Sequence, residues 1–128
     1  MKENQIRVLK VAPFATPEVC MLNNHLRALQ EAVSIGIDYV GLIEVVSLEE
    51  DTRACIICNE EGKLIGLPLN RCVGYDIIAG VFYVVGQDET RNFTSLSEEQ
   101  IAYYKKKFEC AEYFISDENG AIIVLRNS

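Results

Sequence analysis

Hydrophobic residues along the chain form short strand-like runs and two repeats with helical spacing. Apolar runs over Ile6–Val11 and Glu18–Leu22 flank the turn sequence FATP, which predicts a β-hairpin. Apolar residues then recur every three to four positions after Asn23 and Asn24, both good N-caps, and Gly36 follows as a stop. The pattern therefore predicts that the chain begins with a hairpin followed by a helix.

The middle of the chain contains its most continuous apolar segments. Tyr39–Leu48 is apolar on both alternating faces, which is typical of a central strand covered on each side. Ala54–Cys58 and Lys63–Leu67 flank the turn sequence NEEG and predict a second hairpin, in which the turn glycine takes a positive φ. Leu67–Asp76 has the composition of a loop, and Ile77–Val85 predicts one buried strand.

The second helix has well-defined start and end signals. Ser97 as N-cap and Gln100 three residues later form a capping box, and Leu96 against Ile101 forms a hydrophobic staple. The lysines 105–107 occupy the last turns, where the helix dipole favours cations. The helix dipole therefore accounts for this lysine run, and we do not interpret the run as a ligand site.

The order of predicted elements indicates the fold class. Hairpin, helix, strand, hairpin, strand, helix and hairpin follow one another, and strands adjacent in sequence are mostly antiparallel neighbours. We therefore predict an α+β protein with a mostly antiparallel sheet and two helices. A β-grasp-like N-terminal half, with the first helix crossing the first hairpin and the strand at Tyr39 continuing the sheet, is the preferred topology.

The last predicted hairpin is unusually apolar. Tyr113–Ser116 and Ala121–Leu125 surround the turn sequence DENG, and the segment AIIVL is apolar on both faces. A strand at the chain end is normally an edge strand, and an apolar edge pairs or aggregates unless something covers it. This strand is therefore expected either to insert into the sheet or to be buried between subunits, and we predict a homo-oligomer with this hairpin at the contact.

The charge and the apolar runs of the chain limit the classes of partner that it can bind. The 12 basic and 19 acidic residues leave a net charge of −7, which repels a phosphate backbone and offers no counterion release, so we expect no nucleic-acid partner. No run approaches the roughly 20 apolar residues that cross a bilayer, and the first ten residues lack an apolar segment after their charges. We expect a soluble, cytoplasmic protein without a membrane partner.

Five cysteines, an odd number, are expected to be free thiols in a reducing compartment. Cys55 and Cys58 form a C-x-x-C, a spacing that zinc and redox sites use. Positions i and i+3 of a strand face opposite sides, however, and the only histidine, His25, has no second ligand at i+4. We interpret both cysteines as small buried hydrophobic residues and expect no metal site.

No catalytic signature stands out along the chain. It lacks G-x-S-x-G, P-loop and G-x-G-x-x-G sequences, and its acidic pairs lie at turns or in the first turn of a helix. His25 at a helix start is interpreted as an exposed or capping residue rather than a general base. We expect no catalytic residues and no cofactor.

The strongest candidate for a binding site is the segment from Asn59 to Arg71. Arg71 can offer a planar fork to phosphate or carboxylate, Lys63 a point charge, Asn59 and Asn70 amide groups, and Tyr75 a stacking face. The alternative is that Asn70 caps its own loop and Arg71 pairs with a surface acid. Together the five residues predict a site for a small anionic ligand.

The same segment carries a family resemblance. The sequences NEEGKLIGLPLNR, DIIAGVFYVVG and FTSLSEEQI, together with VLKVAP and LNNHLRALQEAV, resemble the domain-of-unknown-function family 3846, over roughly Ile6–Phe108. Family members usually have a second basic residue where this chain has Cys72, which argues against a strongly cationic pocket. The length of 128 residues predicts one domain over 1–128, and the resemblance divides it into a family-like core 1–108 and a hairpin extension 109–128.

The resemblance implies where the protein occurs but not which reaction, if any, it catalyses. Its members are small proteins of phages and other mobile elements, so the resemblance implies an accessory protein in the cytoplasm of a bacterial host. Our leading hypothesis is a non-catalytic protein that sequesters an anionic, nucleotide-type immune signal. The alternatives are an acidic inhibitor or adaptor that binds a host defence protein, since net charge −7 attracts DNA-binding surfaces, and an enzyme with an unrecognised site.

Overall fold

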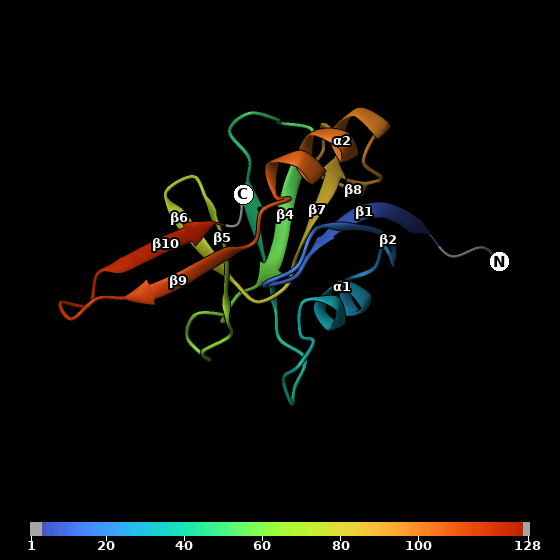
Figure 1. Cartoon of the computed structure of the whole chain (residues 1–128). Helices are drawn as coiled ribbons and strands as arrows, with labels where there is room; N and C mark the ends of the chain where they lie inside the picture. Colours follow the sequence, from blue (N-terminus) through green and yellow to red (C-terminus); the bar gives the residue numbers. More distant parts are fainter. Residues whose placement is uncertain (1–3, 127–128) are drawn as a thin grey trace.

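Antiparallel strand pairing organises most of the structure, a computed structural model that describes residues 4–126 (Figure 1). Within these residues it has two helices and three separate sheets, and the α+β class is confirmed. The elements are β1 (Gln5–Val11), β2 (Glu18–Asn23), α1 (Leu26–Ala32), β3 (Ile43–Ser47), β4 (Ala54–Asn59), β5 (Leu69–Val73), β6 (Asp76–Ala79), β7 (Phe82–Gln87), β8 (Phe93–Thr94), α2 (Glu98–Lys107), β9 (Glu112–Ser116) and β10 (Ile122–Arg126).

The main sheet has six strands, with the order β2-β1-β7-β4-β3 and β8 paired to the end of β7. All of these pairings are antiparallel. β4 is buried along its whole length, and β7 is buried from Phe82 to Gly86, because both strands lie inside the sheet and both are apolar on both faces. The first predicted hairpin is confirmed as β1 and β2.

One helix covers each face of the sheet, so the core has two halves (Figure 1). α2 and the residues around it pack on one face through Leu96, Ile101, Tyr104 and Phe108. α1 packs on the other face through Leu29 and continues into Val33. Strand alternation divides the C-x-x-C between these halves, since Cys55 lies in the α1 half and Cys58 in the α2 half, as expected for positions i and i+3.

The start of α2 follows its sequence signals. Ser97 accepts from the Gln100 backbone N–H at 3.1 Å, and the Gln100 side chain accepts from the Ser97 backbone N–H at 2.9 Å. Both residues of the predicted staple, Leu96 and Ile101, are buried in the same cluster. The capping box is therefore confirmed, and the three lysines occupy the last turn.

α1 is shorter than predicted. Its N-cap is His25 rather than Asn23 or Asn24, because Asn23 still belongs to β2 and the His25 ring accepts from the Ala28 backbone N–H at 3.3 Å. This agrees with the capping interpretation of the histidine. The helix ends at Ala32, before the predicted stop at Gly36, which lies in the following turn.

The strand predicted at the centre of the sheet lies at its edge. Only Ile43–Ser47 of the run Tyr39–Leu48 forms a strand, and this β3 pairs with β4 alone. Exposed Leu42 and Val45 show that its apolar character is not matched by burial. The β-grasp-like start is also wrong, since β7 and β4 lie between β1 and β3.

The second predicted hairpin is wrong as well. Ala54–Cys58 belongs to a strand, but Lys63–Leu67 forms consecutive turns, and the neighbours of β4 are β3 and β7. The turn glycine, Gly62, has no positive φ; a Cβ at this position would lie 2.8 Å from the carbonyl oxygen of Ala79. This glycine therefore permits close backbone packing rather than closing a hairpin.

Two further predictions fail in the next segment. The predicted loop Leu67–Asp76 contains β5, which pairs with β6 through a register shift between Leu69 and Arg71. The predicted single strand Ile77–Val85 is broken at Gly80, whose φ of +81° separates β6 from β7. The left-handed backbone redirects the chain from the small β5–β6 sheet into the main sheet.

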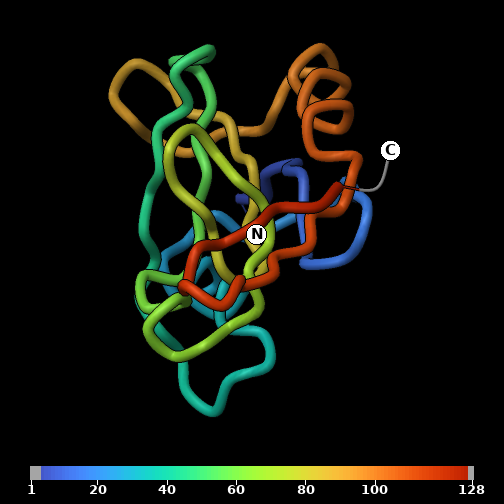
Figure 2. Tube along the Cα trace, turned by 60° about the vertical axis from the view of Figure 1, so that its left-hand side comes forward, coloured from blue at the N-terminus to red at the C-terminus, as the bar shows by residue number. Residues whose placement is uncertain are grey.

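The C-terminal hairpin is confirmed as β9 and β10, with Tyr113 opposite Leu125. It forms its own two-stranded sheet and does not insert into the main sheet. Its base lies beside β5, where a Glu112 oxygen accepts from the Cys72 backbone N–H at 2.8 Å, and Figure 2 shows it passing alongside β5–β6. Its far end extends away from the main sheet (Figure 1). Among residues 4–126, no helix is long and apolar enough to cross a membrane.

Candidate functional site

Arg71, the centre of the predicted anion site, is fully buried and points into the protein. Its Nε and Nη2 donate to the Phe108 carbonyl at 3.2 and 2.8 Å, and Nη2 also donates to the Ala15 carbonyl at 2.6 Å. Nη1 donates to the Asn70 side-chain oxygen at 2.8 Å and to its carbonyl at 3.4 Å. A guanidinium has five N–H donors, and here all five have acceptors within the protein.

These contacts make Arg71 a structural link. It joins the end of α2, through Phe108, to the β1–β2 turn, through Ala15, and to β5. Burial lowers the pKa of the guanidinium, while the charge of Glu112 acts in the opposite direction. Neither the phosphate fork nor the pairing with a surface acid is what the structure contains, because backbone carbonyls hold the side chain.

The two asparagines of the predicted site are also internal. Asn70 is fully buried, and its amide donates to the carbonyls of Val11 and Gly80 at 2.9 and 2.8 Å. Asn59 is buried and donates to the Val33 carbonyl at 3.3 Å. Their amides therefore hold strands and turns together and are not presented to a ligand.

Lys63 and Tyr75 reach the surface but do not form an anion site together. Lys63 pairs with Asp76, while Tyr75 stands fully exposed between β5 and β6. The lining of a hollow of about 380 Å³ beside Lys63 includes four carboxylates, which oppose a second negative charge: Glu44, Glu60, Glu61 and Asp76. The five predicted residues are thus divided between the interior and an acidic surface.

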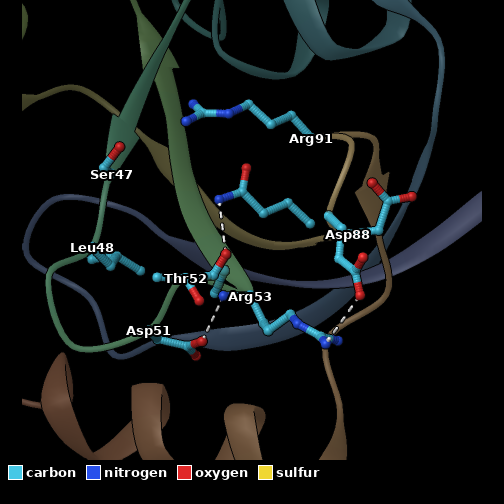
Figure 3. A pocket seen from close by; sticks show the side chains of 10 residues that line it. Ser47, Leu48, Asp51, Thr52, Arg53, Asp88 and Arg91 are labelled. Carbon is cyan, nitrogen blue, oxygen red and sulfur yellow. Dashed lines mark hydrogen bonds and ion pairs between the residues drawn. The ribbon is translucent and has the colours of Figure 1, made fainter.

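A different hollow presents free cationic and hydroxyl groups. This hollow, called the arginine cleft below, has a volume of about 360 Å³ and lies between the β3–β4 connection and the β7–β8 turn (Figure 3). Its size is at the lower end of the range for small-ligand sites. It is lined by Ser47, Leu48, Asp51, Thr52, Arg53, Ala54, Gln87, Asp88, Glu89 and Arg91.

Hydrogen bonds fix the two walls of the cleft relative to each other. The Gln87 backbone N–H donates to the Arg53 carbonyl at 2.9 Å, and the Gln87 amide donates to the Thr52 carbonyl at 3.2 Å. Asp51 accepts from the Arg53 backbone N–H at 2.9 Å and from the Tyr104 hydroxyl at 3.2 Å, which ties this wall to α2. The cleft is therefore preorganised by the fold.

The β7–β8 turn is built around Asp88. One of its oxygens accepts from the backbone N–H groups of Asn92 and Thr90 and from the Thr90 hydroxyl, all at 2.9 Å. The hydrogen bonds from Asn92 and Thr90 lower the pKa of Asp88. They also leave Arg91 at a φ of +68°, a left-handed conformation that is uncommon for a residue with a side chain.

Arg91 extends from this turn across the cleft toward the side on which Ser47 lies (Figure 3). Among the described residues its guanidinium makes no hydrogen bond or ion pair, and the hydroxyls of Ser47 and Thr52 make none either. Arg53 makes only a loose pair with Glu89 at 3.8 Å, and both side chains are largely exposed. These groups can bind an anion without breaking an internal bond of the fold.

Arg91 also borders a second, wider hollow. This hollow has a volume of about 780 Å³ and lies between the start of α1 and β8, where Asn24, His25 and Phe93 line it. Phe93 is half-buried, and the Asn24 amide donates to its carbonyl at 2.9 Å. Arg91 therefore stands at the border of a cationic space and a mixed polar and aromatic space.

Sequence reasoning missed this cleft because its residues are 44 positions apart at the extremes, from Ser47 to Arg91, and meet only through the pairing of β4 with β7. The one local signal was the sequence QDETRN after an apolar strand, where aspartate and asparagine favour a tight turn. Turn chemistry predicts the loop, but not the left-handed arginine at its end.

The comparisons with known proteins place most of the chain in one family. The model for the Domain of unknown function (DUF3846) matches residues 6–109, which includes both walls of the cleft and excludes the C-terminal hairpin. No curated protein matches the chain, and no solved structure matches it.

Proposed function

The chain belongs to the DUF3846 family, and from its own geometry we propose that it binds a small phosphate-bearing anion in the arginine cleft without transforming it. The observation that carries this proposal is the Arg91 guanidinium, which extends across a preformed cleft without a hydrogen bond or ion pair among the described residues. Arginine donates two parallel hydrogen bonds to phosphate or carboxylate, and its planar fork favours such groups.

Three carboxylates line the cleft beside its two arginines, so its net charge does not attract an anion, and the unpaired donors of Arg91 carry the proposal. Asp88 accepts hydrogen bonds from its own turn, and Asp51 accepts from Arg53, Gln100 and Tyr104. Glu89 lies beside Arg53 and is the one carboxylate whose side chain is free to swing outward. Arg91 is therefore the group that an incoming anion meets unpaired.

The chemistry of the cleft supports binding rather than turnover. Its hydroxyls, from Ser47 and Thr52, have no histidine beside them, since His25 caps α1 outside the cleft. The aspartates are held by the hydrogen bonds described above, so they are poorly placed to act as general bases. A binding protein needs only the donors that are present.

The two hollows on either side of Arg91 support a ligand of nucleotide type. A phosphate held by Arg91 would leave an attached base free to lie against Phe93 in the wider hollow. In the phage or mobile-element setting that the family resemblance implies, sequestering a nucleotide signal of the host is a role that needs affinity and no catalysis.

Calorimetry on the wild-type protein and two variants tests this function. With a panel of linear and cyclic nucleotides and inorganic phosphate, we expect saturable binding of at least one phosphate-bearing anion. We expect Arg91→Ala to weaken it by about 10- to 100-fold, the loss typical of a charge-assisted bidentate contact. Lys106→Ala removes the same charge from an exposed position on α2 and is the matched control.

Two results would contradict the proposal. Silence of the wild-type protein across the whole panel would show that the cleft binds no such anion. Equal weakening by Arg91→Ala and Lys106→Ala would show that binding reflects net charge and not the cleft.

A second prediction separates the shape of the cleft from its charge. By charge alone, removing the Asp88 carboxylate should strengthen anion binding; we expect Asp88→Ala to weaken it, because the turn that holds Arg91 loses its acceptor. The same reasoning gives a pH dependence. Because the pKa of Asp88 is lowered, the carboxylate holds the turn fully at any pH above its ordinary pKa of 3.8. We expect this contribution to anion binding to be lost as the pH falls through the lowered pKa.

Affinity measured for Asp88→Ala near neutral pH, with a thermal unfolding curve as the folding control, checks this prediction. Tighter binding by a folded Asp88→Ala protein would show that Asp88 acts on the ligand as a charge and not through the turn.

A further inference from the structure

The most exposed apolar strand of the described chain is β10. All five of its residues are exposed, and it pairs with β9 alone, so one edge of the strand has free backbone groups. A two-stranded sheet by itself is marginally stable in water, and an exposed apolar edge is a template for pairing with another strand. Among the described residues, β10 therefore lacks a neighbouring strand on the side opposite β9.

Exposure is shared evenly between the two faces of β10. Ile122 and Val124 on one face are 49% and 37% exposed, and Ile123 and Leu125 on the other face are 47% and 49% exposed. A layer packed on one face would cover one pair and leave the other in water. A strand added at the side would shield both pairs, so the missing neighbour is lateral.

The charges of the hairpin select the direction of that neighbour. Arg126 lies at the open end of β10, where its Nε pairs with Glu112 of the same hairpin at 3.0 Å and the side chain stays largely exposed, and the turn at the opposite end carries Asp117 and Glu118. Two copies of β10 that run antiparallel bring the arginine of each copy toward the acidic turn of the other. A parallel arrangement would place like charges side by side, which is unfavourable.

We propose that two copies of this chain associate through antiparallel pairing of their β10 strands, giving one four-stranded sheet with Val124 at the twofold axis. In this register Ile123 of each copy lies opposite Leu125 of the other. The pairing uses both free edges and then stops, so it produces a closed dimer and not an open polymer. The inference is independent of the arginine cleft.

A cysteine at the axis tests the register directly. In antiparallel pairs, directly opposite residues have Cα atoms about 4.5–5.5 Å apart, within the range a disulfide spans. We expect Val124→Cys to form a disulfide-linked dimer under mild oxidation. Val45→Cys introduces the same thiol on the other apolar edge strand, β3, at an exposed position, and should remain monomeric on a non-reducing gel, as should the wild-type protein.

A charge at the axis tests the association without chemistry. By light scattering over a range of concentrations, we expect the wild-type protein to be a dimer, and Val124→Lys to weaken the dimer roughly tenfold or more because two lysines then face each other. Val45→Lys is the control, and thermal unfolding verifies that both variants fold.

Three outcomes would overturn the proposal. They are a wild-type protein that stays monomeric at high concentration, a dimer that Val124→Lys leaves intact, and equal cross-linking through Val124→Cys and Val45→Cys.

Discussion

Replacing Arg71 with alanine should lower the free energy of unfolding by about 3–5 kcal/mol, one of the two largest losses we expect from a single substitution. The change removes five internal hydrogen bonds and leaves the carbonyls of Phe108, Asn70 and Ala15 without this donor. It also opens a cavity at a fully buried position. The stability of Arg71→Lys should lie between those of the wild-type protein and Arg71→Ala, because a single ammonium cannot replace the planar fork.

Urea unfolding of the variants measures these losses. Arg27→Ala provides the matched control: it removes the same side chain from the exposed surface of α1, where Arg27 pairs only with Glu31, and should cost less than about 0.5 kcal/mol. If Arg71→Ala is as stable as Arg27→Ala, the network around Arg71 does not hold α2 and the β1–β2 turn in place.

Replacing Phe82 with alanine should cost a similar amount, about 3–5 kcal/mol. Phe82 begins β7, is fully buried, and meets the ring of Phe108 edge-on at 5.3 Å between centroids. Its removal leaves a cavity between the central strand of the sheet and the end of α2. The loss adds to that of the aromatic contact itself.

The control for this prediction is Phe14→Ala, the same chemical change at a side chain that is 55% exposed and stacks only on the edge of the hairpin through Tyr113. Thermal and urea unfolding should both rank Phe82→Ala well below Phe14→Ala in stability. Equal losses at the two positions would contradict the two-layer core in which β7 lies at the centre.

The parts of the fold that local sequence predicts are those that local chemistry determines. The capping box at Ser97 and Gln100 and the terminal hairpin around DENG involve residues within a few positions of one another, and each is formed as expected. The separation of Cys55 from Cys58 follows from strand alternation alone.

Predictions failed where the outcome depends on distant partners. Several runs are apolar on both faces, and their pattern does not say which run takes the centre of the sheet; β4 and β7 do, and β3 is left at the edge. Gly62 fits a hairpin turn by composition, yet its role is set by the Ala79 carbonyl that packs on it. Such contacts are decided by tertiary packing and not by neighbours in sequence.

The candidate site shows the same division. Arg71 has the chemistry of an anion ligand, but three of its five hydrogen bonds go to carbonyls 37 and 56 positions away. No sequence pattern marked Arg91 as a binding residue. Its place in the cleft follows from its left-handed backbone in the β7–β8 turn and from the wall opposite it. The anion ligand and a host defence protein as partner both remain predictions, and the anion site at Arg91 is our proposal.

An NMR titration that follows the arginine side-chain Nε–H resonances tests the central claim most directly. With a phosphate-bearing ligand identified by calorimetry, we expect saturable shifts of Arg91, while Arg71 stays unchanged because backbone carbonyls already hold its guanidinium. Shifts confined to the Lys63–Tyr75 surface, or an unmoved Arg91 at saturation, would contradict it.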